Sequence, residues 1–337
     1  MRTIVAVAVL LSASAVAAED KPFTDAEIRA ILAHGPWPAP PTTDPGNRAS
    51  GKREAIELGQ RLFFDPRLSG DGRFSCGTCH VPERNWTDNR TRGVAAAEVD
   101  RNTPTLMNLR LARSFGWAGT SDTLWGQSIR PMLDARELGA SARHVADLLR
   151  QDDQLACRYR KTFGEPPSAS DDQAVLVGVA KALAAFQETF ETPPTPFDRF
   201  RDALARGEPI RPELYSEAAR RGLRTFIANC STCHSGPNFT SGEFHDNGFS
   251  KVGRPDPGRG GKFKVPTLRH LMLTAPYGHH GEIETIADAV RHYSERGSDA
   301  VKLLKLSAAQ QSDLVVFLES LSTLSNPWRP EDHARCE

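Results

Sequence analysis

Two short stretches of this chain carry the same pattern of residues. Residues 76–80 read Cys-Gly-Thr-Cys-His, and residues 230–234 read Cys-Ser-Thr-Cys-His. Each stretch follows a segment whose apolar residues recur at helical spacing. A similar tripeptide follows each one, Asn-Trp-Thr at 85–87 and Asn-Phe-Thr at 238–240. This internal repeat predicts two related modules, one in each half of the 337-residue chain.

Two cysteines separated by two residues and followed by histidine are typical of covalent haem attachment. The thiols form thioethers with the haem, and the histidine offers a ring nitrogen to the iron. A zinc site shared by both cysteine pairs would leave the two histidines unexplained, and so would a dithiol redox motif. We therefore expect two c-type haems. Their attachment residues are Cys76, Cys79 and His80, and Cys230, Cys233 and His234.

The N-terminus has the features of a secretory signal peptide. Arg2 precedes the apolar run 4–11, and residues 15–17 (Ala-Val-Ala) give the small-x-small pattern of a cleavage site. The apolar run is too short to span a hydrocarbon core of ~30 Å, and no later segment has the length and apolar character of a membrane span. We expect residues 1–18 to be removed on export and the mature chain to be periplasmic.

Composition excludes several classes of protein. The chain has 39% hydrophobic and 25% charged residues, which are ordinary values for a globular protein rather than a disordered or fibrous one. Its 42 basic residues balance 42 acidic ones, so we expect no nucleic-acid partner. Of the six cysteines, only Cys157 and Cys336 lie outside the repeats. Export permits a disulfide between them, but the sequence does not decide whether they form one.

Helical periodicity and capping signals dominate the chain, and alternating strand patterns are scarce. Helices are expected from Arg53 to before Pro66, over 174–190, from Ser216, over 285–295, and after Ser307. We predict an all-α fold. Its parts are a proline-rich surface strap at 19–52, a haem domain at 53–190, a linker at 191–212 and a second haem domain at 213–330.

The sixth ligand of the first iron cannot be a histidine from the loop that follows its motif. No histidine lies between His80 and His144. Met107 and Met132 are the remaining candidates in that region, although methionine is a common filler of apolar cores and we favour core packing for both. This leaves the first iron open to an added ligand.

For the second iron, the candidates lie near the end of the chain. They are Met272, His279, His280, His292 and Tyr293. In the helix expected at 285–295, Tyr293 shares an inward face with Ile286 and Val290, whereas His292 is turned about 100° towards solvent. Periodicity alone does not distinguish an iron ligand from a core tyrosine.

In its motifs the sequence resembles the bacterial di-haem cytochrome c peroxidases and their relative MauG, over residues 57–137 and 213–297. Besides both haem motifs, the resemblance rests on Leu58-Gly59, Leu62-Phe63, Asp65, Leu68-Ser69, Asn102-Thr103-Pro104-Thr105, Trp117-x-Gly119, Gln127-x-x-x-Pro131, Glu137-Leu138-Gly139, Phe263-Lys264-Val265-Pro266-Thr267-Leu268-Arg269 and Thr274-Ala275-Pro276-Tyr277. It implies two cytochrome c-like domains, each with one covalently bound haem.

The resemblance also implies catalytic roles. Trp117 matches the tryptophan between the two haems, and Gln127 and Glu137 match the distal pair over the peroxide-binding iron. The implied activity is reduction of hydrogen peroxide at the N-terminal haem, with electrons passed through the C-terminal haem. The donor would be a small redox protein such as a cytochrome c or a cupredoxin.

Two further sites are implied by the resemblance. Asn102, with the backbones of Thr274 and Pro276, matches a calcium site between the haems, and this oxygen-only ligand set suits calcium. Tyr293 falls where the peroxidases carry a methionine ligand and MauG a tyrosine. Together with the missing loop histidine, Tyr293 makes the implied ligation MauG-like. The alternatives are an electron-transfer cytochrome without peroxide chemistry and a MauG-type oxidase that modifies a partner protein.

Overall fold

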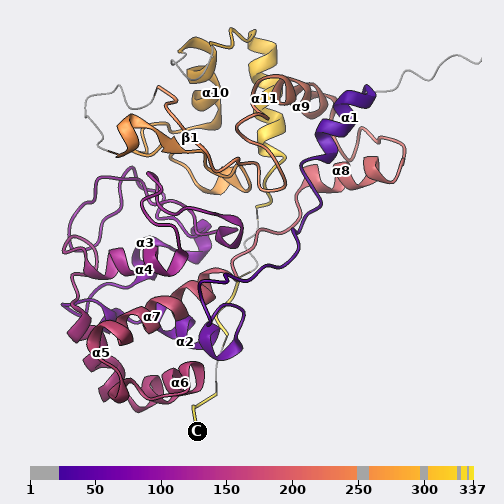
Figure 1. Ribbon diagram of the computed structural model, residues 1–337. Coiled ribbons are helices and arrows are strands. Elements are labelled where there is room, and N and C mark those ends of the chain that lie inside the picture. The colour runs from indigo at the N-terminus through magenta and orange to yellow at the C-terminus, as the bar shows by residue number, and fades with distance from the viewer. Residues whose placement is uncertain (1–22, 249–257, 297–302, 325–327, 332–333) are drawn as a thin grey trace, which may run out of the picture.

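The computed structural model describes residues 23–248, 258–296, 303–324, 328–331 and 334–337, and its regular structure is almost entirely helical. Figure 1 shows two lobes, each with its own hydrophobic core, joined by extended segments. The described strands are β1 (Phe244–His245) and β2 (Phe263–Lys264), which pair antiparallel with Phe244 opposite Lys264. The predicted all-α class therefore agrees with the helical character of the structure.

The first lobe is built around α7 (Asp172–Gln187), which is buried along most of its length. α2 (Arg53–Phe64), α4 (Leu124–Leu133) and α5 (Ala142–Gln151) pack against α7, and α6 (Asp153–Phe163) packs against α2 and α5. The one-turn helix α3 (Cys76–Cys79) carries the first Cys-x-x-Cys pair and lies beside α2. The lobe therefore presents the first motif from a rigid helical base.

The second lobe repeats this arrangement. α9 (Glu217–Asn229) leads into the second motif and packs against α11 (Ala308–Glu319), and α10 (Ile286–Glu295) packs against α11. A glycine marks the helix crossing in each lobe. A Cβ added at Gly59 would lie 2.1 Å from a carbonyl oxygen of α7, and one added at Gly222 would lie 2.0 Å from a carbonyl oxygen of α11. The internal repeat of the sequence is thus a repeat of packing.

Most helix boundaries follow the sequence signals. The side chains of Asp171, Ser216, Thr285 and Ser307 cap the helices that were expected to begin beside them. Ser307 and Gln310 form the predicted capping box. These confirmed boundaries rest on local chemistry, because a side-chain oxygen accepts from a backbone amide that the first turn leaves without a partner.

Two predicted segments need correction. The strap at 19–52 contains α1 (Asp25–Leu32), and its Ile31 is fully buried in the second core rather than lying on the surface. The predicted linker at 191–212 contains α8 (Pro196–Ala205), whose Phe197 is also buried in that core. Proline density was misleading because Pro196 occupies the first turn of α8, where its missing N–H removes no intrahelical hydrogen bond.

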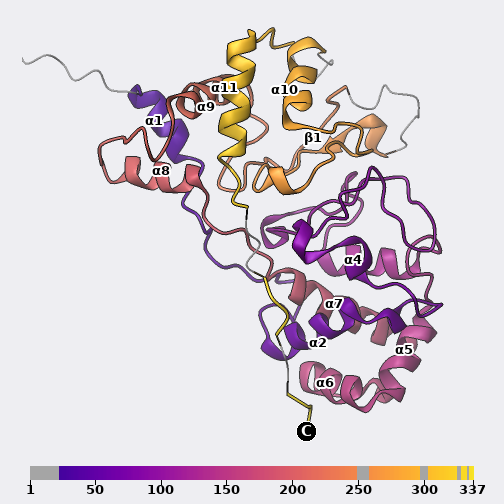
Figure 2. The ribbon, with the colours of Figure 1, turned by 180° about the vertical axis from the view of Figure 1, so that it is seen from behind.

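The first and last described segments of the chain lie with opposite lobes. α1 lies with α8 and α9 in the second lobe, and the chain end lies beyond α6 of the first, as the reverse view in Figure 2 also shows. A disulfide joins Cys157 of α6 to Cys336, with a Cα–Cα distance of 6.1 Å. The pairing that the sequence left open is therefore made, and it fastens the C-terminal segment to the first lobe.

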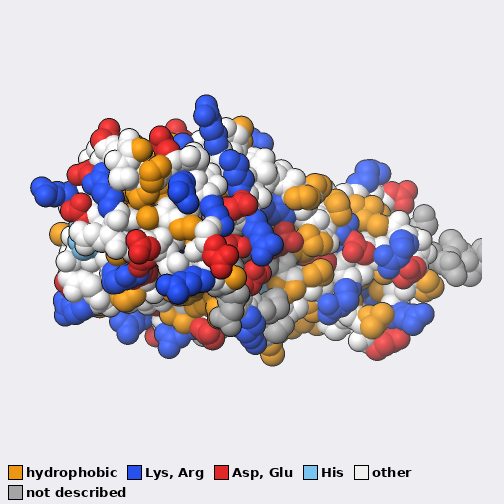
Figure 3. All heavy atoms as spheres, turned by 90° about the horizontal axis from the view of Figure 1, so that it is seen from below, with side chains coloured by type: hydrophobic (Ala, Val, Ile, Leu, Met, Phe, Trp, Pro, Cys, Tyr) orange, Lys and Arg blue, Asp and Glu red, His pale blue; other side chains and the backbone are white. Residues whose placement is uncertain are grey.

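The surface mixes charges of both signs. Figure 3 shows acidic and basic side chains interspersed over the face seen from below, as the balanced composition predicts. Within the residues that the structure describes, no helix has both the length and the apolar character needed to cross a membrane. The expected signal peptide at 1–18 lies outside the described residues.

Candidate functional site

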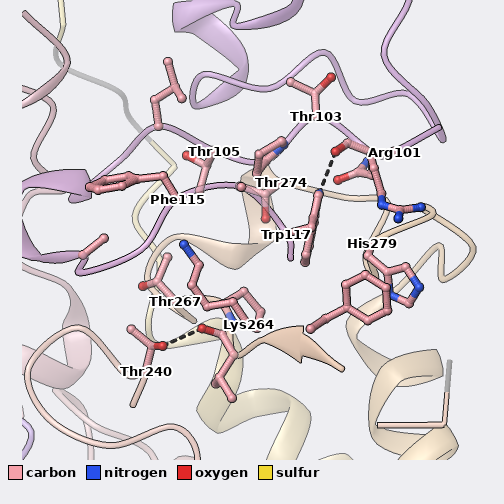
Figure 4. A pocket seen from close by; sticks show the side chains of 18 of the residues that line it. Arg101, Thr103, Thr105, Phe115, Trp117, Thr240, Lys264, Thr267, Thr274 and His279 are labelled. Carbon is pink, nitrogen blue, oxygen red and sulfur yellow. Dashed lines mark hydrogen bonds between the residues drawn. The ribbon is translucent and has the colours of Figure 1, made fainter. Parts of the chain in front are cut away.

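A cavity of about 1620 Å³ lies between the two lobes, and both repeats open onto it. Pockets for a single small ligand usually measure ~300–1,000 Å³, so this cavity has room for more than one large group. Figure 4 shows side chains of both lobes converging on it. The motif residues that line it are Cys76, Cys79, His80, Cys230, Cys233 and His234.

The two motif histidines are held in the same way. Nδ1 of His80 donates to the backbone carbonyl of Trp86 at 2.9 Å, and Nδ1 of His234 donates to that of Phe239 at 3.1 Å. Donation from Nδ1 leaves Nε2 as the ring atom with a free lone pair. Burial lowers the pKa of His80 and brings that of His234 to about 4, so both rings are neutral and able to bind a metal.

The motif residues fit haem attachment better than zinc binding. None of the four motif cysteines forms a disulfide, whereas the other two cysteines are paired with each other. Among the described residues, no three or more His, Cys, Asp or Glu side chains come together as a metal cluster. Zinc would need four such ligands at one point. Two separate Cys-x-x-Cys-His motifs on the wall of a large cavity instead match one haem for each motif.

Gln127 and Glu137 line the cavity on the side of the first motif. Gln127 is held by α4, and its buried Oε1 has no hydrogen-bond partner among the described residues. A buried amide oxygen in that state is suited to accept a hydrogen bond from a bound group. Glu137 is near enough to the thiols of Cys76 and Cys79 to act on them electrostatically. Both residues therefore line the cavity that the first motif shares, and Glu137 lies near the cysteines of that motif.

The carboxyl group of Glu137 has a raised pKa. Burial is the main cause, and the nearby negative charge of Asp134 adds to it. The cations of Arg136 and Arg130 act in the opposite direction with smaller effect. A carboxyl group whose pKa is moved towards neutrality can both accept and return a proton.

Trp117 stands where the two lobes meet. Its indole Nε1 donates to the carbonyl oxygen of Asn102 at 2.8 Å, and its own carbonyl accepts from the amide of Lys264 in the second lobe at 2.9 Å. Figure 4 shows the indole between the two sets of side chains. Trp117 is thus hydrogen-bonded to a residue of each lobe and lines the cavity that both motifs share.

Tyr293 faces the cavity from α10 on the side of the second motif. Burial raises the pKa of its phenol to about 12, although a hydrogen bond with the side chain of Asn247 opposes this. His292 points elsewhere, as predicted, but it is half-buried rather than in solvent, and its Nε2 donates to the Asn247 carbonyl at 3.0 Å. Of the other candidates, His279 lines the cavity, whereas Met272 is 39% exposed.

The methionines of the first lobe are core residues. Met132 is fully buried in the first hydrophobic core, and Met107 is 4% exposed in the same core, although it also borders the cavity. His144 bonds to the carbonyl oxygen of Arg67 at 2.8 Å, outside the cavity lining. The first motif therefore shares its cavity with Gln127 and Glu137, and the loop that follows the motif contributes no histidine.

The residues expected at a calcium site come from both lobes. Asn102, Thr274 and Pro276 all line the cavity. The side-chain nitrogen of Asn102 donates to the carbonyl oxygen of Arg90 at 2.8 Å, so its side-chain oxygen is the atom left to face a ligand.

Two cavity residues were missed at the sequence level. Lys264 points its amine into the cavity wall, where Nζ donates to the carbonyl oxygen of Ser114 at 2.6 Å and burial lowers its pKa to about 8. His245 of β1 lines the cavity near enough to His234 to affect its pKa. The available signal for Lys264 was a charged residue placed between two apolar ones, Phe263 and Val265. Nothing in the local sequence distinguishes His245.

Comparison with known proteins agrees with the geometry. A family model for di-haem cytochrome c peroxidase matches residues 53–205. The methylamine utilization protein MauG of Methylophilus methylotrophus is 33% identical over 82% of this chain and 86% of that protein. MauG of Methylorubrum extorquens is 36% identical over 80% of this chain and 78% of that protein.

A solved structure agrees as well. It is that of a MauG-like protein associated with microbial copper homeostasis, at 28% identity and a TM-score of 0.70, covering 88% of this chain and 99% of that one. The resemblance inferred from the motifs is thereby confirmed. This chain belongs to the di-haem cytochrome c peroxidase family, a family of haem-containing oxidoreductases that includes MauG.

Proposed function

We propose that this protein is a periplasmic di-haem peroxidase with MauG-like ligation. One c-type haem is attached through Cys76 and Cys79 in a first domain at 53–190, and the other through Cys230 and Cys233 in a second domain. Hydrogen peroxide is reduced at the first haem, and electrons enter through the second. The overall reaction takes one peroxide, two protons and two electrons to two water molecules.

One observation carries this proposal. Glu137, with its raised pKa, lies near the cysteines of the first motif, and Gln127, with its unpartnered oxygen, lines the same cavity. No histidine follows that motif until His144. A pure electron carrier gains from two complete sets of iron ligands and has no use for a proton-transferring carboxyl group beside one haem. The arrangement therefore favours peroxide chemistry over the electron-transfer alternative.

Bound haem iron would supply the electrons that break the oxygen–oxygen bond. The contribution of the protein is to place and move protons. Glu137 takes a proton from the inner peroxide oxygen and returns one to the outer oxygen, which leaves as water. Gln127 orients the peroxide by a hydrogen bond to its Oε1. Trp117, bonded to both lobes, is placed for electron exchange between the two haems.

A calcium ion at the lobe junction is part of the proposal. The side-chain oxygen of Asn102 and the backbone oxygens of Thr274 and Pro276 would hold it, because hard cations prefer such oxygen ligands. Removing calcium with a chelator should disturb the spectra of both haems, since the site would lie between them. Spectra that do not respond to chelator or to added calcium would contradict this part.

A MauG-type oxidase that modifies a partner protein is the second candidate. Tyr293 on the cavity wall beside the second motif favours it, because an anionic tyrosine ligand stabilises oxidised iron more than a thioether does. Two of the relatives are themselves named MauG. In that case the two oxidising equivalents would be used on a residue of another protein rather than on a small electron donor.

Mixing the ferric protein with hydrogen peroxide before any reductant is added tests the proposal. We expect an immediate change of the haem spectrum, and then oxidation of two equivalents of a reduced small cytochrome c or cupredoxin for each peroxide. A spectrum that does not change would leave only the electron-transfer function. A spectrum that changes while every soluble donor stays reduced would favour the MauG-type reaction.

A further inference from the structure

The two motif histidines depend on two aromatic residues with an unusual backbone. Trp86 and Phe239 accept from the histidine Nδ1 atoms, and they occupy equivalent positions in the Asn-Trp-Thr and Asn-Phe-Thr tripeptides. Their φ angles are 62° and 51°, in the left-handed region. Bulky residues seldom adopt this conformation, which persists only where surrounding structure enforces it. The packing around each ring therefore sets the direction of the carbonyl that orients the histidine.

Trp86 is held from one side by the C-terminal segment, which we define as residues 328–331 and 334–337. Its ring is stacked on Phe190 at 3.7 Å between centroids, and Trp328 meets it edge-on at 5.0 Å. Phe63 completes the enclosure at 5.6 Å, and Trp86 is fully buried. Trp328 is the contact of this set that comes from outside residues 53–190 of the first lobe.

The C-terminal segment is fastened to the first lobe beyond Trp328. The side chain of Gln60 donates to the Glu331 carbonyl at 2.8 Å. The side chain of Gln154 exchanges two hydrogen bonds with the backbone of Cys336, at 2.7 and 3.3 Å. The disulfide from Cys336 to Cys157 closes the segment covalently. These contacts keep Trp328 against Trp86 without any helix or strand in the segment itself.

Phe239 is held by the opposite end of the chain. The imidazole of His34, which follows α1, is stacked on the Phe239 ring at 4.5 Å with an interplanar angle of 9°. Nδ1 of His34 donates to the carbonyl of Gly236 at 3.0 Å, within the same turn. Phe197 of α8 meets Phe239 edge-on at 5.2 Å. His34 is 2% exposed, so this contact is part of the interior.

We propose that His34 and Trp328 are positioning residues for the haem-binding histidines. His34, near the N-terminus, fixes the orientation of the His234 ring, and Trp328, near the C-terminus, fixes that of the His80 ring. His34 acts through the ring and carbonyl of Phe239, and Trp328 acts through those of Trp86. The inference rests on the proposed attachment of haem at the two motifs, but it is independent of the reaction with peroxide.

The expected consequence is a change in ligand strength at one haem at a time. A hydrogen bond from the histidine N–H to a carbonyl fixes the ring orientation and raises the basicity of the metal-binding nitrogen. A weaker bond makes the histidine a poorer donor to ferric iron, so the reduction potential of that haem rises. Loss of such a supporting partner typically changes metal binding about 10-fold or more.

Two variants test this, one at each haem. Trp328→Ala should shift the first haem only, with roughly a tenfold higher ratio of reduced to oxidised haem at a fixed potential, which corresponds to about 59 mV. His34→Ala should shift only the second haem. The measurements are a spectroscopic redox titration and electron paramagnetic resonance, which resolve the two haems. Trp328→Phe and His34→Phe keep the ring contact and should restore values near those of the wild type.

A third variant addresses the covalent tether. Cys157→Ser/Cys336→Ser leaves every ring in place, and it should produce a smaller shift of the first haem with the second unchanged. Potentials and resonance signals equal to the wild type in both alanine variants would overturn the proposal, as would equal shifts of both haems in each. Wild-type protein without covalently bound haem in a haem stain would overturn the proposed attachment as well, so the two failures are distinguishable.

Discussion

Asp134 and Glu137 lie on one turn, where the Glu137 amide donates to the Asp134 carbonyl at 2.9 Å, yet their carboxyl pKa values shift in opposite directions. Hydrogen bonds from Arg136 lower the pKa of Asp134, whereas burial raises that of Glu137. Neighbouring acidic groups whose pKa values are shifted in opposite directions often have different roles in proton transfer. The turn after α4 therefore separates a structural carboxylate from a candidate catalytic one.

Replacement of Glu137 by glutamine should slow the reaction of the ferric protein with peroxide about 10²–10⁴-fold, because glutamine cannot carry a proton. Both haem spectra should stay nearly unchanged. Stopped-flow mixing measures the rate, and Glu83→Gln, on the exposed surface of the same lobe, is the matched control. A Glu137 effect below about threefold would mark it as a surface charge, since surface substitutions rarely change a free energy by more than about 0.5 kcal/mol.

The rate should also depend on pH through this group. Glu137 acts as a base only when ionised, so acidification through its pKa should reduce the rate. Because burial raises that pKa, the fall should begin above the usual range of a glutamate near 4.3. The same fall should be absent in Glu137→Gln. A fall of equal size and position in the variant would assign the pH dependence to another group.

The first haem should be accessible without prior reduction. Gln127 and Glu137 line the same cavity as His80, and no histidine follows His80 in the sequence until His144. We expect a high-spin ferric signal and binding of cyanide to the oxidised protein, measured by absorption and electron paramagnetic resonance. Two purely low-spin haems that bind cyanide only after reduction would contradict an open site.

Tyr293→Met should give the second haem a histidine and methionine ligand set and raise its reduction potential, since a thioether favours ferrous iron. Tyr277→Phe is the control, because Tyr277 also lines the cavity but its hydroxyl donates to the Leu271 carbonyl at 2.9 Å. The readouts are the potential and the ligand-field bands of the second haem. Values unchanged in Tyr293→Met would make Tyr293 a core residue.

The sequence predicted the features that depend on local chemistry. Helix starts at capping side chains and the Tyr293 face of α10 followed from a few neighbouring residues. What it missed depends on contacts between distant segments. The disulfide partner of Cys157 lies 179 residues away. Lys264 lies at the cavity where its backbone amide donates to the carbonyl of Trp117 in the other lobe. No local pattern encodes such distances.

The predictions for the two proline-rich segments, 19–52 and 191–212, were wrong for the same reason. α1 and α8 are short helices whose apolar residues, such as Ile31 and Phe197, are stabilised by the second core rather than by their own periodicity. Helices of this length are marginal in isolation, so tertiary packing decides whether they form. Proline content alone could not show that a packing surface was available to them.

The buried pair of Asp198 and Arg269 supports the second lobe, and its loss should unfold the protein more readily. Two charge-assisted hydrogen bonds of 2.8 and 2.9 Å join the side chains, both of which are fully buried. Asp198→Asn leaves the guanidinium buried without its counter-charge and should cost about 3–5 kcal/mol in the free energy of unfolding. Denaturant titration measures it. Asp313→Asn breaks the pair with Arg221, which is 56% exposed, and should cost no more than about 1 kcal/mol.

The pH dependence of stability gives a second test of the same pair. Hydrogen bonds and the charge of Arg269 hold the pKa of Asp198 below its usual value despite burial. A carboxyl group with a lowered pKa in the folded state stabilises the fold above its unfolded pKa, near 3.9, and this contribution is lost as pH falls through the folded value. The wild type should therefore lose stability on acidification below about pH 4 more steeply than Asp198→Asn. Parallel acid unfolding curves for the two proteins would show that the pair contributes no such term, and that the stability of the second lobe rests on its apolar core.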